Sequence, residues 1–157
     1  MKHEKILKII TIVFIAILGI QNCGPGFDKS EAIVEKLLSG KTESFIPERI
    51  VAAALKNSLI IQMISGNEVI SVTVSGDKPE LWKGKHALTG NIIGTTVFSH
   101  KDQRIEYIGR NGEIKIEKLR LGDNGYVIGR FYGNFPNGDW KGTFKAFIDK
   151  NLSFYKS

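Results

Sequence analysis

The sequence predicts a mainly β protein, an antiparallel β-sandwich or barrel of about eight strands with one short N-terminal helix. From residue 50 onward, apolar and polar residues alternate with a period of two, in runs of about five to eight residues. Turn signals separate these runs. The strongest is Asp123-Asn124-Gly125, because Asn-Gly readily adopts the positive φ angles of a tight hairpin.

The alternation places the strands along the last two thirds of the chain. We expect them over residues 50–55, 59–65, 69–74, 92–98, 104–108, 113–121, 126–135 and 140–148. The polar stretch over 76–90 is expected to form a long loop. Aromatic residues that share one face of the last two strands are assigned to the core: Phe131, Phe135, Trp140 and Phe144.

Ahead of the strands, the apolar residues have a helical spacing. They are Ala32, Ile33, Val34, Leu37 and Leu38. Asp28 or Ser30 can cap the start of such a helix, and Gly40 can end it. We therefore expect a short amphipathic helix over residues 28–39, packed as a lid on the domain core.

The N-terminus has the layout of a signal peptide. Lys2, Lys5 and Lys8 precede an apolar run over residues 9–20. This run is well short of the roughly 20 residues that a membrane-spanning helix needs. Cys23, the only cysteine of the chain, follows closely. With one cysteine, the domain has no disulfide and no thiolate metal cluster to stabilise it.

The residues Ile20-Gln21-Asn22-Cys23 resemble a bacterial lipobox, in the relaxed form of spirochaete lipoproteins, where Asn before the cysteine is tolerated. The resemblance implies cleavage before Cys23 and a diacylglyceryl group on its thiol, and two acyl chains suffice for stable anchoring. We therefore expect a lipoprotein signal peptide over 1–22, a lipidated tether over 23–27 and a single mainly β domain over 28–157. The location implied is the cell envelope, at the outer membrane. The alternative is an ordinary signal peptide and a secreted protein with a free thiol.

Three segments of the domain carry a second resemblance: Gly112-Glu113-Ile114-Lys115-Ile116-Glu117-Lys118-Leu119, Gly129-Arg130-Phe131-Tyr132-Gly133 and Lys141-Gly142-Thr143-Phe144-Lys145. Their order is similar to that in a group of uncharacterised bacterial lipoprotein domains built as antiparallel β-sandwiches. The resemblance covers residues 50–148. It implies a β-sandwich in the cell envelope and carries no catalytic residues across.

Composition and motifs argue against an enzyme. The 157 residues are 42% hydrophobic and 10% aromatic, which is enough for one core, and the formal net charge of +6 is too small to indicate nucleic-acid binding. The sequence contains no nucleophile elbow, no phosphate-binding glycine loop and no calcium loop. Its histidines lack metal-ligand spacing. We expect no catalytic residues, no metal and no cofactor.

A binding or structural module anchored to the membrane is the expected function, with two more specific alternatives. In the first, an adhesin binds an anionic polysaccharide or glycolipid through cations and an aromatic ring that point outward from the last three strands. These residues are Lys115, Arg130, Tyr132, Lys141 and Lys145. In the second, a barrel carries a small hydrophobic ligand beneath the 28–39 helix. The first alternative competes with an ordinary solubilising surface, because acidic residues dilute the patch.

Overall fold

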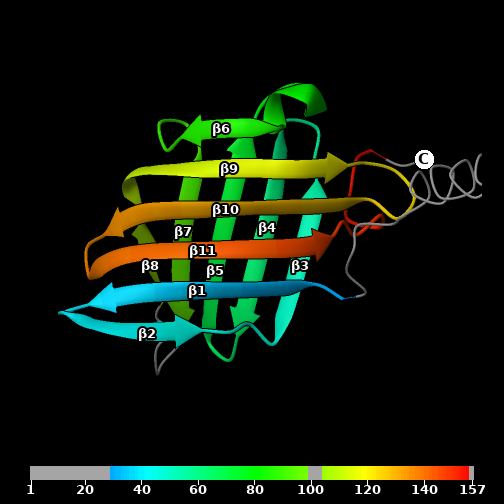
Figure 1. Cartoon of the computed structure of the whole chain (residues 1–157). Helices are drawn as coiled ribbons and strands as arrows, with labels where there is room; N and C mark the ends of the chain where they lie inside the picture. The colour runs from blue at the N-terminus through cyan, green and yellow to red at the C-terminus, as the bar shows by residue number, and fades with distance from the viewer. Residues whose placement is uncertain (1–28, 99–103, 156–157) are drawn as a thin grey trace, which may run out of the picture.

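Two antiparallel sheets face each other across one hydrophobic core (Figure 1). The computed structural model describes residues 29–98 and 104–155. The six-stranded sheet has the order β2 (Lys41–Phe45), β1 (Glu31–Leu38), β11 (Gly138–Phe147), β10 (Tyr126–Phe135), β9 (Arg110–Arg120) and β6 (Gly84–Ala87). The five-stranded sheet has the order β3 (Arg49–Ala54), β4 (Ser58–Ser65), β5 (Glu68–Ser75), β7 (Ile92–Phe98) and β8 (Arg104–Ile108).

The predicted mainly β fold is confirmed, and of the two predicted architectures the structure has the sandwich. Both sheets are open, so they do not form a closed barrel. In Figure 1 the strands of one sheet cross those of the other instead of running alongside them, as in the orthogonal class of sheet packing. The turns follow their predicted chemistry, since Gly66 and Asn124 have φ angles of 52° and 54° between the strands that they join.

The predicted helix over residues 28–39 is wrong, because most of this segment is the strand β1. Ala32, Val34 and Lys36 point into the core, while Ile33 and Leu37 are exposed on the outer face. A lysine on the inner face breaks the apolar alternation, so the period of two was not visible in the sequence. The hydrophobic-carrier hypothesis required a barrel and a helix that covers it. The described residues form neither of these two features.

Two edge strands were not predicted. β2 reads Lys-Thr-Glu-Ser-Phe, and β6, inside the predicted 76–90 loop, reads Gly-Lys-His-Ala. Both are short and mostly polar, as edge strands that resist further pairing often are. The same loop contains the 3₁₀ turn η1 (Pro79–Trp82), which buries Trp82. Neither strand has the apolar alternation on which the sequence prediction depended.

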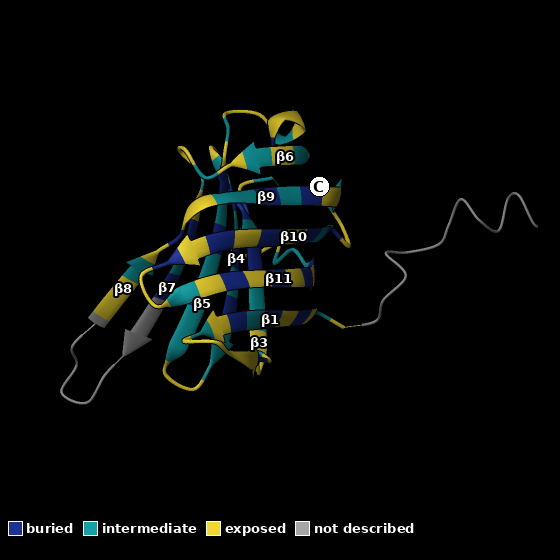
Figure 2. Cartoon of the chain, turned by 60° about the vertical axis from the view of Figure 1, so that its left-hand side comes forward, coloured by how far each residue is buried: buried dark blue, intermediate teal, exposed yellow. Residues whose placement is uncertain are grey.

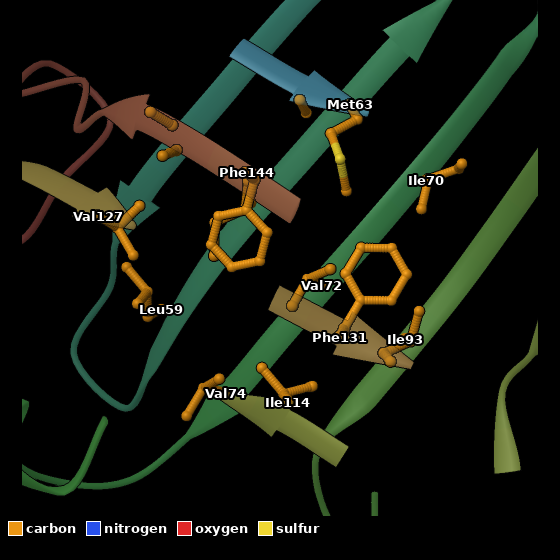
Figure 3. Close-up of a cluster of buried hydrophobic side chains, with 14 of the residues drawn as sticks. Leu59, Met63, Ile70, Val72, Val74, Ile93, Ile114, Val127, Phe131 and Phe144 are labelled. Atoms are coloured by element: carbon orange, nitrogen blue, oxygen red, sulfur yellow. The ribbon is translucent and has the colours of Figure 1, made fainter. Parts of the chain in front are cut away.

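The four predicted core aromatics are buried, and the inner face of β10 and β11 shows how they fit. Gly129 lies opposite Phe144, and Phe131 lies opposite Gly142. A Cβ atom on Gly142 would lie 2.7 Å from the Phe131 ring, so only glycine leaves room for the ring to cross the neighbouring strand. Figure 3 shows Phe131 and Phe144 among aliphatic side chains of the facing sheet, including Val72. Alternation of large and small residues thus fills the space between the sheets.

One ion pair joins the two sheets inside this core. The Lys36 ammonium on β1 donates a hydrogen bond to Glu68 Oε1 on β5 at 2.5 Å, and the Thr95 hydroxyl on β7 donates to the same oxygen at 3.2 Å. Lys36 Nζ also lies 4.9 Å from the centre of the Phe45 ring and 4.5 Å from that of Trp140. The Lys36 side chain is only 9% exposed and that of Glu68 is 23% exposed. The charges are therefore compensated by each other, by a hydroxyl and by two aromatic faces.

Replacing Lys36 with methionine should destabilise the fold, because it leaves the Glu68 carboxylate shielded from water without its cation. We expect a loss of about 2–4 kcal/mol in the free energy of unfolding, measured by urea titration. Lys141→Met is the matched control, since it removes an exposed lysine paired with Glu35 on the outer face of the same sheet. Its loss should stay below about 1 kcal/mol. Equal losses in the two variants would contradict a structural role for the buried pair.

Candidate binding face on the six-stranded sheet

The outer face of the six-stranded sheet brings together all five residues of the predicted ligand face. Figure 2 shows buried and exposed residues alternating along β10, β11 and β1, so every second side chain points away from the core. We call this surface the Tyr132 face and define it by the outward residues Glu113, Lys115, Arg130, Tyr132, Lys141, Thr143, Lys145, Glu31, Ile33 and Glu35.

Strand register orders these side chains into rows. Lys115, Arg130, Thr143 and Ile33 lie opposite one another on successive strands. The next row is Glu113, Tyr132, Lys141 and Glu35. Tyr132 thus has a carboxylate on one neighbouring strand and an ammonium group on the other. The residue is 53% exposed.

The face is hollowed by two adjoining depressions. The larger has a volume of about 670 Å³ and is lined by Lys115, Arg130, Tyr132 and Lys141 among others. The smaller, of about 380 Å³, also includes Tyr132 and Lys141 in its lining. Four of the five predicted residues therefore border one depression. Lys145 is the exception, because it lies one row further along β11, beside Glu31.

Each cation of the predicted face has an acidic neighbour. Lys141 Nζ lies 2.8 Å from Glu35 Oε2, and Lys145 Nζ lies 4.0 Å from Glu31 Oε2. These two acids were absent from the sequence-based site, because residues 28–39 were expected to be a helix. Their spacing of four residues gave no signal of this placement, because it puts both carboxylates on one face of a helix as well as on one face of a strand. The ion pairs are solvent-exposed and contribute little to stability.

Lys115 and Arg130 differ from the other cations because they share one carboxylate. Glu117 Oε1 lies 3.8 Å from Lys115 Nζ and 3.6 Å from Arg130 Nε. Glu113, the next acid along β9, is 3.4 Å from Lys85 on β6. The Lys115 and Arg130 side chains are 33% and 57% exposed. This corner of the depression therefore carries two positive charges for one negative charge.

A β-bulge places Lys115 and Arg130 beside each other. The pairing of β10 with β9 shifts register between Ile128 and Gly129, so Glu117 is the extra residue opposite this step. A Cβ atom on Gly129 would lie 2.6 Å from the Lys115 carbonyl oxygen and 2.6 Å from the Phe144 ring. Glycine at position 129 is thus required for the close approach of β9, which sets the geometry of the shared carboxylate.

The arrangement suits a ligand that offers apolar patches and many polar groups. The flat ring of Tyr132 can pack against the carbon–hydrogen face of a sugar, while the surrounding ammonium and carboxylate groups donate and accept hydrogen bonds. Among the described residues, no group of three or more His, Cys, Asp or Glu side chains could hold a metal ion. The part of the chain that the structure describes also contains no helix long and apolar enough to cross a membrane.

Comparison with known proteins adds no relative: the chain matches no protein-family model, no curated protein and no solved structure. Cys23, the signal peptide over 1–22 and the tether over 23–27 lie outside the described residues. Lipidation of Cys23 therefore stays a prediction.

Substituting Gly129 with alanine should strain the bulge, since the new methyl group meets both a backbone oxygen and a buried ring. We expect a loss of about 1–3 kcal/mol in the free energy of unfolding, measured by urea titration. Gly94→Ala is the control, because its Cβ would have only ordinary contacts, the nearest at 3.5 Å. A Gly129→Ala protein as stable as the Gly94→Ala protein would show that the β9–β10 approach is not tight.

Proposed function

We propose that the protein is a lipid-anchored binding module of the bacterial cell envelope, and that an anionic glycan or glycolipid binds to its Tyr132 face. The observation that carries the proposal is the depression around Tyr132, bordered by two cations that share one carboxylate. Its volume of about 670 Å³ lies within the range of small-molecule sites.

The charges favour a ligand with a few localised anionic groups over a uniform polyanion. Ion pairs with acids of β1 neutralise Lys141 and Lys145, so the face as a whole has little excess charge. Arg130 and Lys115 retain one positive charge between them after pairing with Glu117. A sulfate, phosphate or uronate group placed there gains charge-assisted hydrogen bonds, with Arg130 able to bind it in a bidentate manner.

The proposed anchor lies close in sequence to the face. Only seven residues separate Cys23 from Glu31 at the start of β1, a distance of at most about 28 Å when fully extended. Lipidation at Cys23 would thus hold the Tyr132 face within reach of the headgroup layer of the same membrane. This supports an envelope glycolipid, or a glycan next to the membrane, as the ligand.

Alanine substitutions at Arg130 and Tyr132 should each weaken ligand binding. We expect about a tenfold loss for Arg130→Ala toward deacylated lipopolysaccharide, whose phosphate groups are localised, at low salt, because one charged hydrogen-bonding group is removed. Tyr132→Ala should cause a similar loss that persists at high salt, since packing on the ring is not screened. Isothermal titration calorimetry at two salt concentrations measures both.

Lys56→Ala is the matched control, because it removes an exposed cation at the β3–β4 turn, outside the Tyr132 face. Glu117→Gln should raise the affinity a few-fold, since it frees the charge shared by Lys115 and Arg130. Affinities that are unchanged in both alanine variants, or reduced equally by Lys56→Ala, would refute the proposed ligand face. A heparin octasaccharide, which is a uniform polyanion, serves as the comparison probe in the same series and should bind more weakly.

The anchor itself is tested by intact mass spectrometry of the membrane-extracted protein. We expect a chain that begins at Cys23 and carries acyl groups, because the lipobox resemblance implies both cleavage and lipidation there. In the Cys23→Ser variant, the acyl mass should be absent. An unacylated wild-type chain released into the medium would instead support the secreted alternative.

A further inference from the structure

Exposed apolar side chains gather at the end of the sandwich where the C-terminal segment follows β11. Eleven large hydrophobic residues of the described chain are exposed. Four of them lie on three segments at this end: Leu55 after β3, Leu81 in η1, and Leu152 and Phe154 in the C-terminal segment. Leu152 is 52% exposed and Phe154 is 63% exposed. We call these four residues the apolar end.

Backbone and ring contacts hold the three segments together. The Phe154 N–H donates a hydrogen bond to the Ala54 carbonyl at 2.7 Å, which places the C-terminal segment beside Leu55. The Tyr155 ring packs edge-on against Trp82, the last residue of η1, with 5.7 Å between ring centres. The C-terminal segment therefore lies between the end of β3 and η1, and the apolar end is a built part of the fold.

Lysines surround the apolar end, and they lack the acidic partners that the cations of the Tyr132 face have. The lysines on the three segments are all exposed: Lys56, Lys78, Lys83 and Lys150. Among the described residues, none of them forms an ion pair. Acids on the same segments keep the net charge small: Asp77, Glu80 and Asp149. Long lysine side chains can cover apolar surface while their ammonium groups stay in water or near phosphates.

The start of β1 lies at the same end of the sandwich. The Phe147 N–H, at the end of β11, donates to Ser30 Oγ at 3.1 Å. Figure 1 shows the start of β1 and the C-terminal segment on the same side of the molecule, at the right. Cys23 precedes Ser30 by seven residues, a distance of at most about 25 Å when fully extended. A lipid group on Cys23 would therefore keep this end of the sandwich close to the bilayer surface.

We propose that the apolar end contacts the membrane that holds the Cys23 anchor, with Leu152 and Phe154 inserted at the level of the lipid headgroups. This contact depends on the lipid anchor of the proposed function. Aromatic and aliphatic side chains beside lysines are typical of segments that lie in a membrane interface. Because β1 begins at this end and β11 finishes there, both strands lead away from the bilayer, and the Tyr132 face remains open at the side.

A protein partner fits the apolar end less well than a bilayer does. A specific protein interface takes about 20–30 residues from each side, whereas the apolar end consists of four side chains on three short segments. A few inserted side chains suffice at a bilayer, because the lipid anchor already supplies the attachment. Insertion is then an intramolecular step with a high effective concentration.

Quenching by brominated lipids tests whether the apolar end meets the bilayer. Both tryptophans of the chain, Trp82 and Trp140, are buried, with 0% and 2% exposed, so the wild type gives a low background. Phe154→Trp adds an exposed tryptophan at the proposed contact. The full acylated chain is reconstituted into phosphatidylcholine and phosphatidylglycerol vesicles, with or without bromine on the acyl chains. We expect bromine to remove about half of the added emission, since interfacial side chains lie about 5–10 Å deep.

Three further variants control for position and charge. Asn137→Trp adds a tryptophan in the β10–β11 turn, at the opposite end of the sandwich, and its emission should not be quenched. Leu152→Glu, combined with Phe154→Trp, should remove most of the quenching, because a carboxylate resists insertion. Leu37→Glu in the same background replaces an exposed leucine at the far end of β1 and should leave the quenching unchanged. Thermal unfolding verifies that each variant folds.

Flotation of the same vesicles separates this contact from the anchor. A chain that floats with the vesicles while Phe154→Trp stays unquenched retains the anchor and refutes the contact. A second copy or another protein on the apolar end would give this result. Equal quenching of Phe154→Trp and Asn137→Trp also refutes the contact, since no end of the sandwich is then preferred. A wild-type chain that carries no acyl group and does not float refutes both the anchor and the contact.

Discussion

The ion pair between Lys36 and Glu68 determines which side of β1 faces the core. The orientation of β1 in turn determines which charged side chains lie on the outer face of the six-stranded sheet. A shift of β1 by one residue would turn Lys36 outward, leave Glu68 without its cation and bury Glu35. With Lys36 inside, Glu31 and Glu35 are fixed on the outer face opposite Lys145 and Lys141. A polar contact inside the core therefore sets the charge pattern of the proposed ligand face. Burial of an ion pair is an inefficient way to gain stability, but it specifies register well.

The glycines of β10 and β11 make room for aromatic rings on the inner face of the six-stranded sheet. Gly133 lies opposite Trp140, just as Gly129 lies opposite Phe144. Every second inward position is thus small, and the ring on the neighbouring strand extends over it. Trp140 in turn stacks on Phe135, with 4.3 Å between ring centres, and covers the Lys36 ammonium. The buried aromatic rings are therefore in direct contact with the buried ion pair. A substitution in either group would change the packing of the other.

The sequence predicted the sheets well from β3 onward, except for β6, because the other strands there have one apolar face and clear turn chemistry at their ends. It failed where a strand lacks that signature: β1 carries a lysine on its inner face, and β2 and β6 are polar edge strands. For the candidate site, alternation sufficed to place Lys115, Arg130, Tyr132, Lys141 and Lys145 on one face. It could not reveal that β1 adds two acids to this face, since the pairing of β1 with β11 is a contact between distant parts of the chain. The β-bulge that joins Lys115 and Arg130 through Glu117 was equally invisible.

The edges of the sheets favour recognition through faces over recognition by added strands. The six-stranded sheet ends in the short strands β2 and β6, which offer few backbone groups to another chain. At β3, the C-terminal segment occupies the edge: the backbone N–H groups of Asp149 and Phe154 donate to the carbonyls of Ala52 and Ala54, and the Ala54 N–H donates to the Ser153 hydroxyl. With these three edges blunted or covered, the two broad outer faces are the larger surfaces available to a ligand or partner. The Tyr132 face, patterned with charge pairs around an exposed tyrosine, is one of these two surfaces, and this agrees with recognition through a face.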